Sequence, residues 1–210
     1  ADFAIWKFAE EGVQRLQEWD SPWGRGFPGW HLECSAMSMG ALGKTIDIHG
    51  GGGDLIFPHH ECEIAQSESH NGVPFSRYWV HAGLVAYQGT KMSKSLGNLV
   101  FVSDLRKRID PRAIRVALMA HHYRTDFEWF DEEGPKAQAD LELLLEATSA
   151  AAPVFEGSLI AEVREALDND LDAPTAREIL LDRARTLSKT SDLEARGELI
   201  AAARLCGIAL

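Results

Sequence analysis

The spacing of hydrophobic and polar positions changes along the chain. In the first half, short apolar runs such as residues 45–48 and 78–81 are separated by glycines and turn residues, a pattern that predicts strands. From Asp110-Pro111 onward the apolar positions recur three and four residues apart, which predicts amphipathic helices. We therefore expect an α/β domain over residues 1–109 and a helical domain over residues 110–210.

Glycine and proline mark the expected helix boundaries. Pro58 suits the first turn of a helix, which we expect to run to about His70, where Asn71-Gly72 ends it. Beyond residue 110 the periodicity predicts further helices over residues 136–147, 158–168, 173–188 and 192–208.

Composition limits the classes of protein to consider. With 210 residues, of which 45% are hydrophobic and 25% charged, the chain suits one substantial domain with or without a small appendage. No apolar run reaches the ~18 residues that span a bilayer, so we expect no membrane partner. The net charge of −11 leaves contact with nucleic acid to local basic patches such as Arg106-Lys107-Arg108. Three irregularly spaced cysteines argue against a disulfide scaffold and predict a reducing, cytoplasmic location.

The segment Lys91-Met92-Ser93-Lys94-Ser95 carries two lysines three residues apart, followed by Leu96-Gly97-Asn98. Lysine is a compact charge on a flexible stem, so it can follow phosphate groups as they move. Phosphoryl and adenylyl transfers gain rate from positive charge placed where negative charge develops. The pattern predicts catalytic roles for Lys91 and Lys94, and the alternative is a solvated surface loop.

Cys34, His59 and Glu63 form a candidate metal set. His59 and Glu63 are four residues apart, so a helix presents both from one face. Sulfur, imidazole and carboxylate together suit zinc, with one ligand position open. The alternative is a buried structural cysteine beside a surface His/Glu pair. His60 and Cys62 are nearby competitors that point to other faces of the same helix.

A glycine run follows the expected strand at 45–48. Residues 49–54 read His-Gly-Gly-Gly-Gly-Asp. Glycines allow close approach of a ligand to the backbone and either sign of φ, and Asp54 suits a pair of ribose hydroxyls. The alternative is a flexible turn.

The order of these motifs resembles that in the cysteinyl-tRNA synthetase family of class I aminoacyl-tRNA synthetases. The resemblance is dense over about residues 2–125 and looser beyond. It rests on residues 2–7, 19–24, 28–37, 49–54, 57–61 and 91–95.

The resemblance implies the second half of a class I synthetase nucleotide-binding, Rossmann-like catalytic domain, followed by an α-helical bundle region. It also implies ATP-dependent activation of L-cysteine to cysteinyl-adenylate and transfer to the 3′ end of tRNA-Cys. ATP would enter with Mg²⁺. The implied zinc ligands are Cys34, His59 and Glu63, and this zinc would bind the thiolate of the substrate cysteine.

The resemblance also implies roles for residues outside the metal set. Trp30 would line the substrate pocket, and Lys94 would stabilise the reacting phosphorus and the departing pyrophosphate. The adenylate would be held by His49, Gly51 and Asp54.

Two features of the family are not found in this sequence. Its first zinc cysteine and its upstream histidine-glycine ATP motif have no counterpart before Cys34. The chain also opens on Ala1 and not on methionine. We therefore expect a piece of a longer protein, inactive by itself.

A related ligase is the alternative reading. The ligase that joins cysteine to the amine of glucosaminyl-inositol in mycothiol biosynthesis shares this catalytic domain, and residues 81–83, 98–103 and 122–126 with Trp129 resemble it. Glu63 and His49 argue for the synthetase, because we expect the ligase to lack that zinc ligand and to carry Gln in place of His49. A third reading, a catalytically inactive paralogue that binds zinc or a partner, is opposed by the intact lysine segment and metal set.

Overall fold

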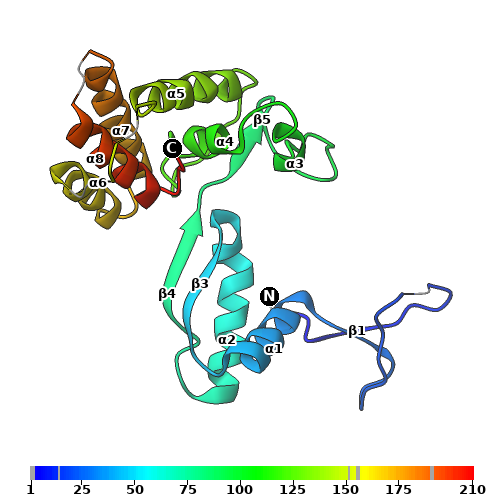
Figure 1. Cartoon of the computed structure of the whole chain (residues 1–210). Helices are drawn as coiled ribbons and strands as arrows, with labels where there is room; N and C mark the ends of the chain where they lie inside the picture. The colour runs from blue at the N-terminus through cyan, green and yellow to red at the C-terminus, as the bar shows by residue number, and fades with distance from the viewer. Residues whose placement is uncertain (1–2, 14, 151, 155–156, 190–191) are drawn as a thin grey trace. The chain divides into compact units, whose positions relative to one another are not determined.

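The structure is a computed structural model that describes residues 3–13, 15–150, 152–154, 157–189 and 192–210. Its backbone divides into two compact units, Ala1–Ala82 and Gly83–Leu210 (Figure 1). Asp2, part of one motif in the resemblance, lies outside the described residues. In the part of the chain that the structure describes, no helix combines the length and apolar character needed to cross a membrane.

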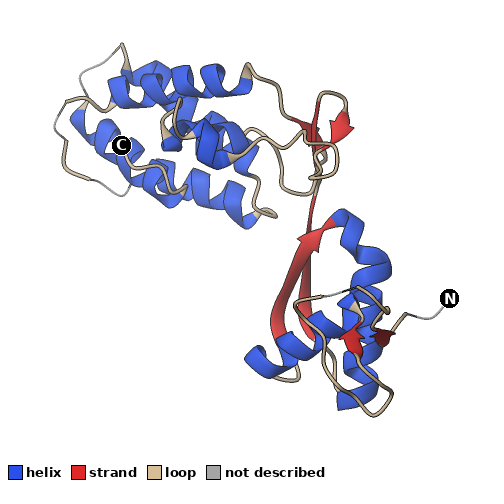
Figure 2. Ribbon diagram, turned by 90° about the vertical axis from the view of Figure 1, so that its right-hand side faces the viewer, coloured by secondary structure: helices blue, strands red, loops and turns tan. Residues whose placement is uncertain are grey.

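The first unit is built around a parallel pair of strands joined by a helical crossover (Figure 2). Parallel pairing requires a long connection, which α2 provides between β3 and β4. Helix α1 packs on α2. The elements are β1 (Trp6–Phe8), β2 (Gly26–Pro28), α1 (Trp30–Leu42), β3 (Ile46–Gly52), a 3₁₀ turn (Gly53–Leu55), a π-type turn (Ile56–His60), α2 (Glu61–Asn71) and β4 (Ser76–Ala82).

Helical backbone begins at Pro58 as expected, and the regular α-helix follows three residues later. Helix α2 begins at Glu61, and Phe57 within the preceding turn has extended dihedrals, φ −135° and ψ 135°. The residue before a proline is pushed out of the helical region by the proline ring, which explains why Phe57 interrupts the turn. At the other end Gly72, with φ 67°, forms the left-handed cap that the sequence predicts.

The second unit is mainly helical. Its elements are β5 (Val85–Tyr87), β6 (Thr90–Lys91), α3 (Val102–Leu105), α4 (Pro111–Leu118), β7 (Phe127–Glu128), α5 (Glu133–Ala147), α6 (Ser158–Asp168), α7 (Ala173–Leu187) and α8 (Leu193–Leu205). Side chains from α4 to α8 form one apolar core, with Leu141, Leu180 and Leu199 almost fully buried. These helices lie close to the sequence-predicted ranges, because leucine and alanine recur at helical spacing.

Aspartates begin three of the helices in this unit. The side chains of Asp110, Asp172 and Asp192 accept hydrogen bonds from the backbone N–H groups of Arg112, Thr175 and Ala195, over 2.8, 3.0 and 3.1 Å. Each bond satisfies an N–H group that a helix start leaves without a partner, so the sequence fixes these boundaries locally.

The boundary between the compact units falls between residues 82 and 83 of the chain, whereas the sequence analysis places a domain boundary at residues 109–110. Pairing over long sequence separation explains the difference. Strand β5 pairs in parallel with β7, and Leu84 N–H donates to Asp126 over 2.7 Å. These contacts join the lysine segment 91–95 to the helical unit. The division into functional domains 1–109 and 110–210 stays a prediction.

Candidate functional site

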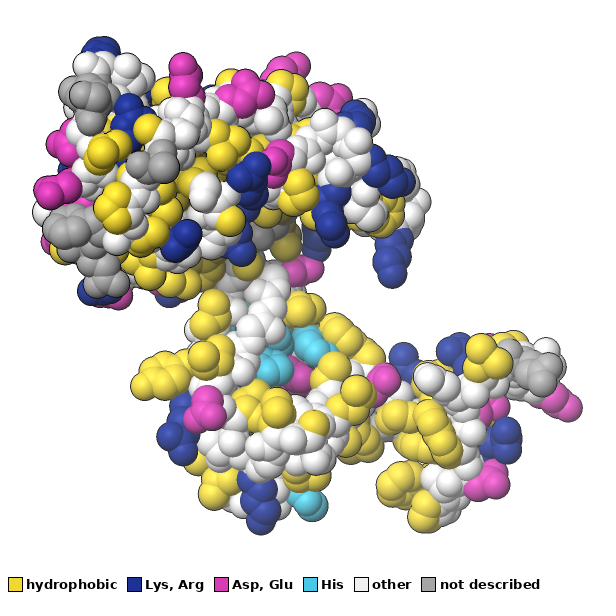
Figure 3. Space-filling view, viewed as in Figure 1, with side chains coloured by type: hydrophobic (Ala, Val, Ile, Leu, Met, Phe, Trp, Pro, Cys, Tyr) yellow, Lys and Arg dark blue, Asp and Glu magenta, His cyan; other side chains and the backbone are white. Residues whose placement is uncertain are grey.

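The interior of the first unit is mostly polar. Its buried apolar side chains are Ile46 and Phe75, among the described residues. Burying polar groups costs free energy unless they are paired, so such an interior indicates a binding site more than a folding core. Figure 3 shows histidines gathered around an acidic side chain on one face of this unit. The buried polar residues are His31, Ser35, His59, His60, Glu63 and Ser67.

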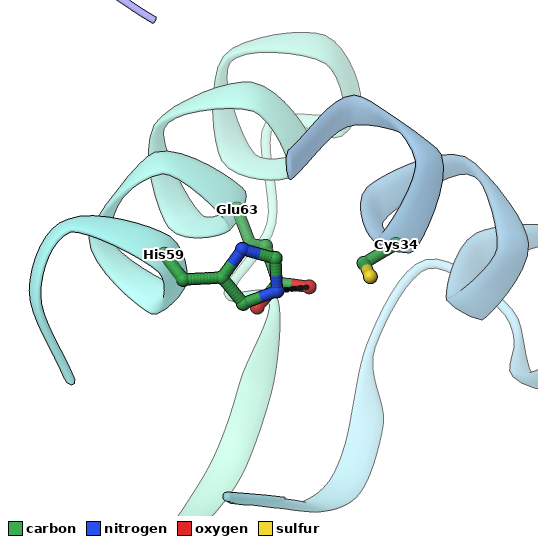
Figure 4. Close-up of side chains that lie close together, drawn as sticks. All are labelled: Cys34, His59 and Glu63. Atoms are coloured by element: carbon green, nitrogen blue, oxygen red, sulfur yellow. Dashed lines mark ion pairs between the residues drawn. The ribbon is translucent and has the colours of Figure 1, made fainter. Parts of the chain in front are cut away.

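Cys34, His59 and Glu63 converge from three neighbouring segments, as the sequence analysis expects (Figure 4). Cys34 projects from α1, His59 from the π-type turn and Glu63 from α2. Their ligand atoms all lie within 4.8 Å of one another, and His59 Nε2 is 3.7 Å from Glu63 Oε1. The Glu63 side chain is fully buried, and its Oε1 has no hydrogen-bond partner among the described residues. A buried carboxylate oxygen without a hydrogen-bond partner is stabilised by a nearby cation, so the three residues fit a zinc ion.

His31 and Trp30 hold the His59 ring from two sides. His31 Nδ1 and His59 Nδ1 share a hydrogen bond of 2.7 Å, which leaves His59 Nε2 facing Glu63. The Trp30 ring stacks on His59 at 3.7 Å between centroids and 11° between planes. Burial, and secondarily His59, lower the pKa of His31. The sequence analysis missed His31, although it lies between Trp30 and the cysteine-bearing turn of the same helix.

The environment of Cys34 favours the thiol over the thiolate. Burial raises its pKa, and the nearby carboxylates of Glu63 and Glu33 raise it further. A bound metal ion reverses this preference because it favours the thiolate, so metal binding at Cys34 should release a proton.

A second group of histidines lies on the other side of Glu63. His49 Nε2 is 2.9 Å from Glu63 Oε2, and His60 Nδ1 is 2.8 Å from His81 Nε2. Burial lowers the pKa of His60 to about 4, and the neighbouring His49, His81 and His59 contribute in the same direction. The sequence analysis treated His60 as a competitor on another helix face and did not single out His81.

Strand register explains how these histidines meet. In the parallel pair β3–β4, His49 lies opposite Trp79 and Gly51 opposite His81. Alternate residues of a strand share a face, so His49 and Gly51 lie on one face with Trp79 and His81. The sequence contains the two-residue spacings His49/Gly51 and Trp79/His81. These spacings place the histidines together only once the strand register is known.

The glycine run forms the end of β3 and is not a flexible turn. None of Gly50 to Gly53 has a φ in the left-handed region, so the expected use of either sign of φ is not realised. Gly51 is instead required by packing, because a Cβ there would lie 2.9 Å from His60 Cε1. A Cβ on Gly50 would make an ordinary contact, 3.5 Å from the Val80 carbonyl oxygen. Asp54 follows in the 3₁₀ turn and is exposed.

These two glycines give a matched pair of variants. Gly51→Ala should destabilise the chain by about 1–3 kcal/mol, because the added methyl overpacks the site beside the His60 ring. Gly50→Ala should change the free energy of unfolding by less than about 0.5 kcal/mol. Urea denaturation of both variants measures the difference. Equal losses would show that the approach of His60 to Gly51 does not determine the glycine.

The lysine segment lies in the second unit and begins at Lys91, the last residue of β6 in an antiparallel hairpin with β5. The Asn98 side chain accepts a hydrogen bond from Ser93 N–H over 2.9 Å and donates to the Lys91 carbonyl oxygen over 3.3 Å. Met92 packs against the apolar core of the unit. Lys94 is exposed in the turn that follows. The backbone is therefore anchored at Met92 and Asn98, while the Lys94 side chain can reach a ligand.

A family described as "tRNA synthetases class I (C) catalytic domain" matches residues 1–139. A cysteine–tRNA ligase of Chlorobium luteolum is 45% identical over 219 residues, which cover 97% of this chain and 45% of that protein. An L-cysteine:1D-myo-inositol 2-amino-2-deoxy-α-D-glucopyranoside ligase of Thermobispora bispora is 49% identical over 176 residues, covering 83% of this chain and 43% of that protein. The chain spans about half the length of the curated relatives it matches.

Solved structures support the same fold. The LeuRS of Agrobacterium radiobacter K84, in a ternary complex with tRNA and LeuAMS, matches with a TM-score of 0.63 and 16% sequence identity. The match covers 90% of this chain and 32% of that one. At this identity the likeness concerns the fold alone.

Proposed function

The chain belongs to the family of class I (C) tRNA synthetase catalytic domains, and from this premise we propose that it forms part of a cysteine-activating, AMP-forming ligase. The reaction joins L-cysteine to ATP as cysteinyl-adenylate, with loss of pyrophosphate, and then transfers the cysteinyl group to tRNA-Cys in the cytoplasm. The similarity to cysteine–tRNA ligases over nearly the whole chain supports this choice of amino acid and acceptor.

One observation carries the proposal: Cys34 and His59 lie around a fully buried carboxylate oxygen of Glu63 that lacks a hydrogen-bond partner in the described structure. These three residues would hold zinc. When bound, zinc supplies a soft Lewis acid that favours the thiolate of cysteine over the hydroxyl of serine. A site of this kind selects the amino acid at the moment of binding.

The residues around the metal set orient its histidine and limit the space for substrate. His31 fixes the ring of His59 through the Nδ1 hydrogen bond, a role typical of residues that support metal ligands. Trp30 stacks on the same ring with its own side chain half-exposed, so it can also contact the amino-acid substrate.

For the nucleotide, we propose that His49, Gly51 and Asp54 contact the adenylate. Lys91 and Lys94 place positive charge at the phosphates and the departing pyrophosphate, with Mg²⁺ accompanying ATP. The anchoring of the segment at Asn98 and Met92 supports this role, since it holds the backbone while the Lys94 side chain is exposed.

The similarity to the Thermobispora enzyme favours a second candidate function, transfer of activated cysteine to the amine of glucosaminyl-inositol. Both functions share the activation step and differ in the acceptor. Supplying the complete protein with ATP, cysteine and either tRNA-Cys or glucosaminyl-inositol distinguishes them. Product with the tRNA alone supports the first function, and product with the sugar alone supports the second.

The metal assignment is tested by two cysteine variants. Cys34→Ser should weaken zinc binding at least about tenfold, because a hydroxyl is a poor ligand for this ion. Cys62→Ser, a change on α2 outside the set, is the matched control and should leave affinity unchanged. Competition with a chromophoric chelator measures both constants. Equal affinities would remove Cys34 from the metal set.

A further inference from the structure

The two oxygens of Glu63 face different sets of ligands. Oε1 faces His59 and Cys34, whereas Oε2 lies 2.9 Å from His49 Nε2. His60 is the third member of this second set, and its ligand atom lies within 4.8 Å of those of His49 and Glu63. A carboxylate can bridge two cations through its two oxygens, as in enzymes with paired metal ions.

The second set has the burial and support expected of a metal centre. Glu63 and His60 are buried, and His49 is partly buried. His60 Nδ1 is bonded to His81 Nε2 over 2.8 Å, which leaves Nε2 as the free ring nitrogen and fixes the ring orientation. The rings of Phe75 and Trp79 pack beside His49 and limit the entry of water.

For an ion to enter, the ligand atoms must shift from their present positions within 4.8 Å of one another. Bonds of about 2.1 Å in a tetrahedral arrangement separate neighbouring ligand atoms by about 3.4 Å. The hydrogen bond between His49 and Glu63 must therefore open by a few tenths of an ångström from 2.9 Å. Two imidazoles and one carboxylate oxygen, without sulfur, suit borderline transition-metal ions better than Mg²⁺ or Ca²⁺.

We propose that His49, His60 and Glu63 Oε2 form a second site for a divalent transition-metal ion, with His81 orienting His60 and Glu63 shared with the Cys34 set. The second site rests on the proposed function only through this shared carboxylate. It also places an ion on His49, the residue assigned above to the nucleotide, so a metal ion and the nucleotide would compete for that side chain.

Cobalt(II) titration of the whole 210-residue chain tests the second site separately from the first. A thiolate ligand to cobalt gives a near-ultraviolet charge-transfer band, which reports Cys34, whereas imidazole and carboxylate ligands give only visible d–d bands. We expect about two cobalt ions per chain. His60→Ala should reduce this to about one with the charge-transfer band retained, and Cys34→Ser should remove the band while about one ion stays bound.

Two further variants keep the result interpretable. His49→Gln removes a ligand with a smaller change in volume than His60→Ala and should give the same loss of one ion. His70→Ala changes an exposed histidine of α2, the helix that carries Glu63, and should bind as the wild type does. The proposal is overturned if the wild type binds a single ion, if Cys34→Ser abolishes all binding, or if both His60→Ala and His49→Gln retain two ions. Binding without any charge-transfer band would contradict the Cys34 set and leave the second site standing.

Discussion

Serine should be a substrate about 10⁴-fold poorer than cysteine for the complete protein, without any separate editing reaction. A site built around one polar contact leaves that contact unmet when the analogue lacks it, and discrimination of 10⁴–10⁵ is then typical. Here the proposed contact is between the substrate thiolate and a zinc ion that Cys34, His59 and Glu63 would hold. The measurement is amino-acid-dependent exchange of pyrophosphate into ATP, expressed as kcat/KM for each amino acid.

Variants of the two cysteines in the first unit show whether the metal set causes this discrimination. Cys34→Ser should lose most of the activity with cysteine through a raised KM, whereas Cys62→Ser should behave as the wild type. The KM for ATP should change little in either variant, because His49, Gly51 and Asp54 are proposed to hold the nucleotide. A Cys34→Ser effect confined to ATP would assign this side chain to the nucleotide and contradict the metal reading.

Lys94→Ala should lower kcat for cysteine-dependent pyrophosphate exchange by about 10²- to 10³-fold. Loss of one preorganised charge-stabilising group costs that much, because the group acts on charge that develops in the transition state. The KM for cysteine should change little, since Lys94 is not in the metal set. Steady-state exchange kinetics of the complete protein measure both constants.

Lys107→Ala is the matched control for the loss of one positive charge. Its ammonium lies on the same unit and is paired with Asp104 over 2.6 Å, outside the lysine segment 91–95. It should retain near-normal exchange. Comparable losses in the two variants would attribute the effect to net charge and not to the position of Lys94.

The fold class and the grouping of Cys34, His59 and Glu63 could be expected from the sequence. The structure brings the ligand atoms of these three residues within 4.8 Å of one another, and their role in metal binding stays a prediction. The α/β class I catalytic fold expected from the motifs is confirmed by the family match and by the solved structures. Helix starts at Asp110, Asp172 and Asp192 are likewise set by capping within a few residues.

Other features depended on contacts between distant segments. The position of the lysine segment in the helical unit follows from pairing of β5 with β7, which are about 40 residues apart, and no local pattern encodes that pairing. Pro58 predicted where helical backbone begins, because proline excludes the preceding Phe57 from helical dihedrals, but the π-type turn before α2 was not predicted.

The sequence by itself determined which residues are proposed to carry the chemistry: the cysteine, histidine and carboxylate of the metal set, the two lysines and the glycine run. Only the tertiary structure decided how they combine. The register of β3 against β4 brings His49 and His81 to one face, so Glu63 contacts histidines on both sides and Gly51 leaves room for His60. Register and burial arise from contacts between distant segments, so residue spacing along one segment cannot predict them.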